Sequence, residues 1–207
     1  MGEVTKGHRL ALEATEQILQ KGGYPADDPG LRDRFADLPR APIEIICCGL
    51  DKTINHGNIL RIADCFRLKR VTFAPVGRKK EKDFSGGFAA LHWQPYLWLD
   101  TAEAVQNAKS EGARIYGLSL EPNSQSIREV KWQFPSAIVL GQELKGIDEE
   151  VKSLCDEFIG IPLYGMIQSL NVAIACGIAV ESAMSKFISS EPNFQPARKA
   201  SQNLKKQ

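Results

Sequence analysis

The sequence predicts a single α/β domain with a mostly parallel sheet and helices on both of its faces. Two segments, IEIICCGL at 43–50 and SAIVLG at 136–141, are continuous apolar runs, and helix-like segments alternate with such runs along the chain. Strands have this composition when helices cover both faces of a parallel sheet. A chain of 207 residues, 43% of them apolar, is large enough for one domain with its own core.

The N-terminal residues form a separate unit in this interpretation. Residues 4–21 repeat apolar side chains at helical spacing and end at Gly22 and Gly23, a frequent helix end. Residues 24–42 contain four prolines and mixed charges, which is typical of a connector. We therefore divide the chain into an N-terminal helix and connector at 1–41, a main domain at 42–188, and a basic tail at 189–207 that we expect to be mobile.

Within the main domain the predicted elements alternate in order. Strands are expected at 43–50, 70–76, 95–99, 114–120, 136–141 and 157–163. Helices are expected at about 57–66, 101–111, 148–154 and 169–187. From Val172 onward the last helix is apolar almost all round, so we expect it to be buried between layers. Ser169 and Asn171 at its start are candidate caps for the free amides of its first turn.

Charge is balanced overall but uneven along the chain. The net charge of +1 gives no global sign of a nucleic-acid partner. From Arg61 to Lys82, however, eight basic residues face two acidic ones, a local net charge of +6. From Glu143 to Glu157 six acidic residues face two lysines, a local net charge of −4. The sequence therefore predicts a polarised molecule with one strongly basic region.

Composition also argues against several classes of protein. Five cysteines without regular spacing indicate reduced thiols, with Cys47 and Cys48 in a strand core. No segment reaches the ~18 apolar residues that span a bilayer, and the first twenty residues are too charged for a secretory signal, so we expect a soluble, cytoplasmic protein without a membrane partner. The three histidines lack metal-ligand spacing, so no metal is expected. Glycine-rich phosphate loops and a GxSxG elbow are absent, which disfavours dehydrogenases and serine hydrolases.

Three polar stretches come directly after predicted strands, where parallel α/β folds bind ligands. The first, NHGNILRIADCF, contains Asn55 and leads into a helix that carries Arg61. The second, VLGQELKGI, contains Gly141 and Glu143, and the glycine allows close approach to the backbone. The third, IPLYGMIQSLNV, opens the last helix. We expect all three to meet at one end of the sheet.

Together, these stretches resemble the SpoU, or TrmH-type, class of SPOUT RNA 2'-O-ribose methyltransferases. The matching positions of the three motifs are Asn55, Gly57, Arg61, Ala63 and Phe66, then Gly141, Glu143 and Gly146, then Ile161, Pro162, Gly165, Ser169, Leu170, Asn171 and Val172. The resemblance covers residues 42–187. Two positions depart from it: Arg67 stands where the class usually has glycine, and Ala173 where it commonly has serine. Arg67 is expected either to alter RNA contact or to extend a surface.

The resemblance implies a trefoil-knotted domain, a rare exception to unknotted topology, that binds S-adenosylmethionine and works as a homodimer. It implies 2'-O-methylation of structured RNA, with a guanosine in the tRNA D-loop favoured over rRNA. A non-catalytic RNA-binding relative is the alternative. The implied cofactor contacts are Leu118, Gly141, Ile161, Leu163 and Leu170. The implied catalytic residues are Arg61, Ser169, Asn171, Asn55 and Glu143.

The roles of these residues leave alternatives open. The family account often makes Arg61 a general base, but a guanidinium stays protonated in proteins, so we favour a charged Arg61 that stabilises the developing alkoxide or binds the adjacent phosphate. The alternative is an exposed arginine paired with Asp64. Glu143 orients Arg61 or a backbone amide, or is a solvated loop acid. Asn55 contacts substrate, caps the following helix, or does both. Three further cysteines are expected to be core residues: Cys65, Cys155 and Cys176.

RNA capture has to be explained without a separate substrate-binding domain. The remaining candidates are the 4–21 helix, its connector, the basic segment 67–82 and the tail. If these bind phosphates, RNA affinity should fall with salt with a log-log slope of about 0.7 per contacted phosphate in single-stranded regions. The basic residues singled out for this role are Arg78, Lys79, Lys80, Arg198, Lys199, Lys205 and Lys206.

Overall fold

A computed structural model of the chain describes residues 31, 35, 37–76 and 88–197. Seven strands form one sheet in the order β3-β2-β1-β6-β4-β7-β5, and every strand pair in it is parallel. The strands are β1 (Ala41–Cys47), β2 (Leu68–Phe73), β3 (Tyr96–Trp98), β4 (Arg114–Leu118), β5 (Gln125–Ser126), β6 (Ser136–Leu140) and β7 (Glu157–Gly160). The predicted parallel sheet is confirmed.

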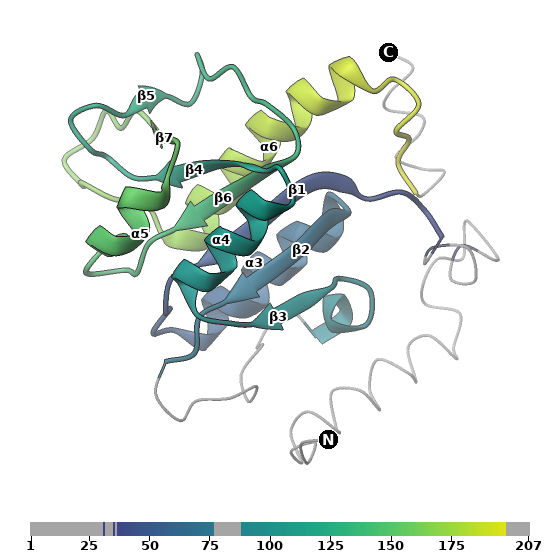
Figure 1. The fold of residues 1–207 in the computed structure, drawn as a ribbon, viewed down its shortest axis with the longest axis horizontal. Helices are drawn as coiled ribbons and strands as arrows, with labels where there is room; N and C mark the ends of the chain where they lie inside the picture. The colour runs from purple at the N-terminus through teal and green to yellow at the C-terminus, as the bar shows by residue number, and fades with distance from the viewer. Residues whose placement is uncertain (1–30, 32–34, 36, 77–87, 198–207) are drawn as a thin grey trace.

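Helices cover both faces of this sheet, also as predicted. Figure 1 shows α4 (Thr101–Ser110) and α5 (Glu149–Leu154) on one side, and α3 (Thr53–Cys65) and α6 (Val172–Ser190) on the other. A short 3₁₀ helix, η1 (Phe88–His92), precedes β3. Each face has its own buried apolar cluster. Ile46, Val105 and Val139 belong to the cluster under α4 and α5, and Ile45 and Ile138 belong to the cluster under α3 and α6.

The bounds of several elements differ from the predicted ones. Helix α3 begins four residues earlier than expected, at Thr53. Strand β7 ends at Gly160, shortly before Pro162, which has no amide to donate to a ladder. Helix α6 begins at Val172 because the side chain of Asn171 accepts hydrogen bonds from the amides of Ala173 and Ile174. Asn171 is therefore the cap, and Ser169, the other candidate, lies before the helix.

Some predictions concern residues outside the described part of the chain. These are the helix at 4–21, the basic residues at 78–80 and the tail residues from 198 onward. The division at 1–41, 42–188 and 189–207 stays a prediction.

Helix α6 requires one correction. It is the one helix among the described residues that is long and apolar enough to cross a membrane by length and composition, with a mean hydropathy of 1.5 over its window. The expectation that no segment is long and apolar enough to span a bilayer was therefore wrong. The core helix of a soluble protein passes the same test. One face of α6 is such a core element, because Ala179, Val180 and Ala183 are fully buried.

The cysteines divide into buried and exposed groups. Cys47, Cys48 and Cys176 are buried, and all five thiols are free, as the sequence indicated. Burial raises the pKa of the Cys176 thiol to about 12, so this group stays protonated and unreactive at neutral pH. Cys155 is half-buried. The core assignment of Cys65 was wrong, because this last residue of α3 is exposed.

A buried carboxyl at the end of α3 gives a pH-dependent prediction. Burial raises the pKa of Asp64 from 3.8 to about 6, although the Arg40 guanidinium acts in the opposite direction. Among the described residues, the Oδ1 atom of Asp64 has no hydrogen-bond partner. The folded state therefore binds this proton more tightly than the unfolded state, and the stability that the neutral carboxyl confers is lost as pH rises through about 6.

We therefore expect Asp64→Asn to raise the free energy of unfolding at pH 8, where the wild-type carboxylate is ionised. At pH 4.5 the gain should shrink, because the wild-type carboxyl is then mostly protonated and resembles the amide. Urea unfolding at the two pH values measures both differences. A variant that is less stable than wild type at pH 8 would mean that the attraction to Arg40 outweighs the cost of burial.

Candidate functional site

The polar stretches meet at the carboxyl edge of the sheet. In the strand register Leu118 of β4 lies beside Leu140 of β6 on one side and beside Ile159 of β7 on the other. These three strands therefore end together, and the chain leaves them at Leu118, Gly141 and Ile161. Three of the residues named as cofactor contacts thus lie at one edge, as ligand sites in parallel α/β folds do.

A hydrogen-bond network joins one residue from each of the three stretches. The side-chain amide of Asn55 donates to Glu143 Oε1 at 2.7 Å. The side-chain amide of Asn171 donates to Asn55 Oδ1 at 3.0 Å. Asn55 is only 1% exposed, so both bonds satisfy polar atoms of a buried side chain. The network therefore ties α3, the loop after β6 and the start of α6 to one another.

Asn55 has a different role from the predicted helix cap. The N-cap of α3 is Lys52, whose side chain makes no capping hydrogen bond, and Asn55 lies inside the first turns of the helix. Its side chain is used instead to bridge two other elements. An asparagine suits this position, because its amide provides a donor for Glu143 and an acceptor for Asn171.

Glu143 is held by backbone amides as well as by Asn55. Burial alone would raise the pKa of this carboxyl, but hydrogen bonds from its own amide, from the Asp51 and Lys52 amides and from Asn55 outweigh burial and lower it. The Asp51 amide lies 3.2 Å from Glu143 Oε2. Glu143 therefore stays ionised at neutral pH and orients backbone amides, which was one of the alternatives. It forms no hydrogen bond or ion pair with Arg61 among the described residues, and its half-buried side chain is held by the bonds described here.

Two glycines shape the loop that carries Glu143. Gln142 and Gly146 exchange backbone hydrogen bonds at 2.8 and 3.1 Å, which closes residues 142–146 into a tight turn. A Cβ on Gly141 would lie 2.5 Å from the carbonyl carbon of Gly146, so a larger residue cannot fit. Gly146 has a φ of +71°, which favours glycine. The spacing Gly-x-Glu-x-x-Gly is therefore what this turn requires.

Other predicted site residues lie outside the network. Arg61 is exposed on α3 and, among the described residues, forms no ion pair with Asp64 or any other acid. It lies six residues after Asn55, which is about 9 Å along the helix axis. Ser169 is exposed in the segment 161–171, and Leu163 in the same segment is half-buried. Leu170 is 37% exposed. In the described part of the chain, no side-chain hydrogen bond joins these residues to Asn55.

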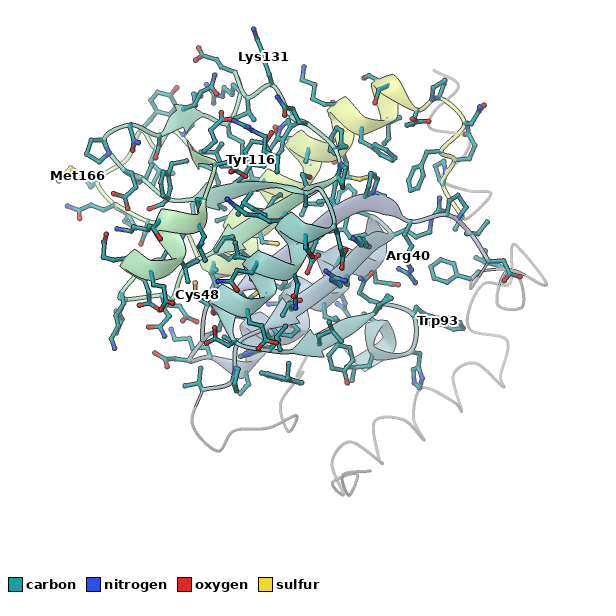
Figure 2. The ribbon with its side chains drawn as sticks, in the orientation of Figure 1. Arg40, Cys48, Trp93, Tyr116, Lys131 and Met166 are labelled. Carbon is teal, nitrogen blue, oxygen red and sulfur yellow. The ribbon has the colours of Figure 1, made fainter. Side chains whose placement is uncertain are left out.

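Sequence reasoning missed two features of the site. One is the Asp51 amide, which no side-chain pattern identifies. The other is a set of exposed apolar side chains on the loops: Leu144 is 91% exposed, Met166 98% and Ile167 77%. Figure 2 shows Met166 projecting from the outer end of its loop, away from the body of the domain. Large apolar residues in polar loops are visible in the sequence, and this pattern could have identified these exposed side chains.

Comparison with known proteins identifies the family. A profile of the SpoU rRNA Methylase family matches residues 42–181. The chain belongs to the SpoU rRNA methylase family. This SpoU match includes all three motifs and both elements that flank the 141–146 loop, strand β6 and helix α5.

Individual SpoU relatives show how far the similarity extends. The tRNA (guanosine(18)-2'-O)-methyltransferase of Thermus thermophilus is 37% identical over 157 residues, 74% of this chain and 77% of that protein. The Escherichia coli protein of the same name is 31% identical over 146 residues, 70% of this chain and 64% of its own length. The solved TrmH/SpoU tRNA modifying enzyme of A. aeolicus has a TM-score of 0.70 at 23% identity, covering 92% of this chain and 93% of that one.

The structure also corrects the interpretation of a departure from the SpoU pattern. Arg67, expected to alter RNA contact or extend a surface, is only 6% exposed. Its φ of +52° lies in the left-handed region, which explains why this position suits the glycine usual in the family.

Proposed function

We propose that this chain transfers a methyl group from S-adenosylmethionine to the 2'-hydroxyl of a ribose in structured RNA, with a guanosine of the tRNA D-loop as the substrate. The observation that carries the proposal is the network of Asn55, Glu143 and Asn171, because it assembles the three family motifs at one sheet edge. The names of the relatives support tRNA over rRNA.

The strand ends suit the proposed cofactor. Gly141, Leu118 and Ile161 lie at the ends of the adjacent strands β6, β4 and β7, where the ladder ends and backbone donors and acceptors become available. Leu163 and Leu170 add apolar surface from the segment that follows β7. An adenine ring needs both features, polar groups for its edge and apolar groups for its faces. When bound, S-adenosylmethionine supplies an electrophilic methyl group.

In this proposal the protein contributes positioning and charge. Arg61 stays protonated and stabilises the negative charge that develops on the ribose oxygen, or holds the neighbouring phosphate. Ser169 and Asn171 face the reacting end. Asn55 and Glu143 fix the surrounding loops before substrate binds, and pre-organised groups of this kind need no rearrangement during the reaction.

The proposal is tested by incubating the protein with tritium-labelled S-adenosylmethionine and total tRNA or total rRNA. We expect label in tRNA, at the 2'-oxygen of a D-loop guanosine when the methylated position is mapped. Label confined to rRNA would support the alternative substrate. Binding of the cofactor without transfer to either RNA would favour a non-catalytic relative.

We further propose that the protein is a homodimer. The Asn171–Asn55 hydrogen bond places the starts of α6 and α3 side by side. Large apolar residues near these helix starts face solvent: Ile54 is 52% exposed, Ile174 57% and Ile178 39%. An apolar patch on neighbouring helices is typical of a surface that a partner covers. Because the patch borders the network, a second copy bound there would lie next to the site.

Replacing Ile174 with aspartate should therefore give a monomer with greatly reduced methyl transfer. Sedimentation at micromolar concentration should report about twice 22.9 kDa for wild type and half of that for the variant. Lys186→Asp, an exposed change on the same helix, is the matched control and should remain dimeric. A fully active monomeric wild type would contradict the proposal.

The family also supports a trefoil knot, which we include in the proposal together with a cytoplasmic location. Helix α6 contacts two segments that lie earlier in the chain. The helix packs against α3. Its Ser182 hydroxyl donates to the Ile127 carbonyl at 3.1 Å and accepts from the Trp132 indole at 3.1 Å. Helix α6 thus contacts both α3 and the β4–β6 connection.

A further inference from the structure

A pocket with a volume of about 430 Å³ lies near the edge of the sheet where β7 pairs with β5. Figure 1 shows these two strands beside each other at that edge. The segment after β5, the segment after β7 and helix α6 contribute the apolar part of the lining: Ile127, Ile161, Pro162 and Ile178. A volume of this size lies within the usual range for sites that bind small organic groups.

Two opposite charges line this pocket without neutralising each other. Arg128 follows β5, and Glu181 lies on α6. Among the described residues, neither side chain forms an ion pair. Both side chains are exposed, so they can bind a ligand without first breaking an ion pair. A ligand that satisfies both must present acceptors to the guanidinium and donors to the carboxylate.

Hydrogen bonds to neighbouring residues hold the polar side of the pocket in place. One terminal nitrogen of Arg128 donates to the Tyr164 hydroxyl at 3.2 Å, which leaves the other N–H groups of the guanidinium for a ligand. On the α6 side, the Ser182 hydroxyl donates to the Ile127 carbonyl at 3.1 Å and accepts from the Trp132 indole at 3.1 Å. The pocket is therefore partly organised before any ligand binds.

Guanine has the polar groups that match this pair of charges. Its O6 and N7 atoms accept hydrogen bonds, and arginine is their commonest partner in nucleic-acid complexes. Its N1–H and 2-amino groups are adjacent donors, and a carboxylate such as Glu181 is an acceptor with two oxygens. Adenine instead presents a donor, its 6-amino group, where guanine has O6. The apolar side chains of the lining suit the faces of the ring.

We propose that this pocket binds the guanine base of the nucleotide that is methylated, with Arg128 at O6 and N7 and Glu181 at N1–H and the 2-amino group. The inference rests on the proposed function, because that function supplies the RNA. Ile161 lines the pocket and also lies at the strand end proposed for the cofactor. The ribose attached to the bound base is thereby directed toward the cofactor.

Methyl transfer to two tRNA transcripts tests the contact with Glu181. The transcripts carry guanosine or inosine at the methylated position, and inosine lacks only the 2-amino group. Wild type should prefer guanosine in kcat/KM by about 10- to 150-fold, the range for one hydrogen bond to a charged group. Glu181→Ala should remove most of this preference. Arg128→Ala should slow transfer to both transcripts and leave their ratio unchanged, because O6 and N7 are present in both.

Glu191→Gln is the matched control for Glu181→Ala. It removes an exposed acid at the end of the same helix, about 15 Å farther along the helix axis, and should keep the wild-type ratio. Because the ratio is compared between enzymes, any effect of inosine on the RNA itself cancels. A preference for guanosine that survives in Glu181→Ala would overturn the proposal and leave the proposed function intact.

A nucleotide titration tests the pocket without methyl transfer. The indole N–H resonance of Trp132 reports on the pocket, because this group donates to Ser182 in its lining. Guanosine 5'-monophosphate added to the full-length protein should shift this resonance. Inosine 5'-monophosphate should bind more weakly, and the difference should disappear in Glu181→Ala. An unchanged Trp132 resonance would overturn the proposal. If wild type methylates no RNA, the proposed function fails, and this titration still decides whether the pocket binds guanine.

A second copy of the chain is the other candidate occupant, because Ile178 also belongs to the apolar patch proposed for the dimer. If the second copy fills the pocket, guanosine 5'-monophosphate will shift the Trp132 resonance only in the monomeric Ile174→Asp variant. That result would overturn the proposal. A shift of the same size in wild type and in Ile174→Asp would support it.

Discussion

Arg61→Ala is expected to reduce methyl transfer by ~10²-fold or more, the loss seen when one charge-stabilising donor is removed from a transition state. Its affinity for S-adenosylmethionine should stay close to that of wild type, because Arg61 is exposed on α3 and the strand ends that suit the cofactor lie on other elements. Single-turnover transfer to tRNA and calorimetric cofactor binding measure the two quantities.

Two further variants are needed to interpret the result for Arg61→Ala. Lysine at this position should not rescue fully, since it keeps the charge but lacks the planar guanidinium fork. Lys186→Ala removes an exposed cation from α6 and should leave transfer unchanged. An active Arg61→Ala enzyme would exclude this side chain from the mechanism. A loss of cofactor binding in the same variant would instead show that Arg61 supports the fold of the site.

Gly141→Ala should weaken cofactor binding without unfolding the domain. The new Cβ would lie 2.5 Å from the Gly146 carbonyl carbon and 2.8 Å from the Ile147 amide nitrogen. Both neighbours are backbone atoms, so the loop 142–146 must move and carry Glu143 out of its bonds with Asn55 and Asp51. Overpacking of this kind costs about 1–3 kcal/mol, which corresponds to roughly 5- to 150-fold weaker binding if the cofactor must restore the loop.

Calorimetry with S-adenosylmethionine measures this loss, and thermal unfolding shows whether the domain remains folded. Gly177→Ala is the matched control. A Cβ at that position meets only the flexible end of Ile62 at 3.6 Å, and alanine is the better helix former. Equal cofactor affinity in Gly141→Ala and wild type would mean that the 142–146 loop adapts without consequence, and would remove it from the proposed binding site.

Local sequence patterns predicted much of the fold, because buried strands and helix caps depend on residues that are close together in the chain. Apolar runs identified β1 and β6, and the polar group before an apolar helix identified Asn171 as a candidate cap. β5 was missed because it has two residues and exists only through pairing with β7. The early start of α3 was missed because the Lys52 side chain gives no capping signal.

The sequence predicted which stretches meet at the site. It did not predict which atoms form hydrogen bonds there. Asn55 is separated from Glu143 by 88 residues and from Asn171 by 116. No local pattern distinguishes such a bridging amide from a helix cap. Arg67 presents the same difficulty, since its partners Pro39 and Phe194 lie on either side of it in the chain. In both cases long-range packing decides whether a polar residue is buried.

The buried Asn55 amide has a consequence for how two ligands influence each other. Its donor is used by the loop after β6 and its acceptor by the start of α6, so displacement of either element leaves a polar atom of a buried side chain without its partner. The two elements therefore order together. A ligand that immobilises the 142–146 loop reduces the entropy that a second ligand must remove when it binds near α6. Because such coupling is reciprocal, the cofactor should increase the affinity for RNA by the same factor by which RNA increases the affinity for the cofactor.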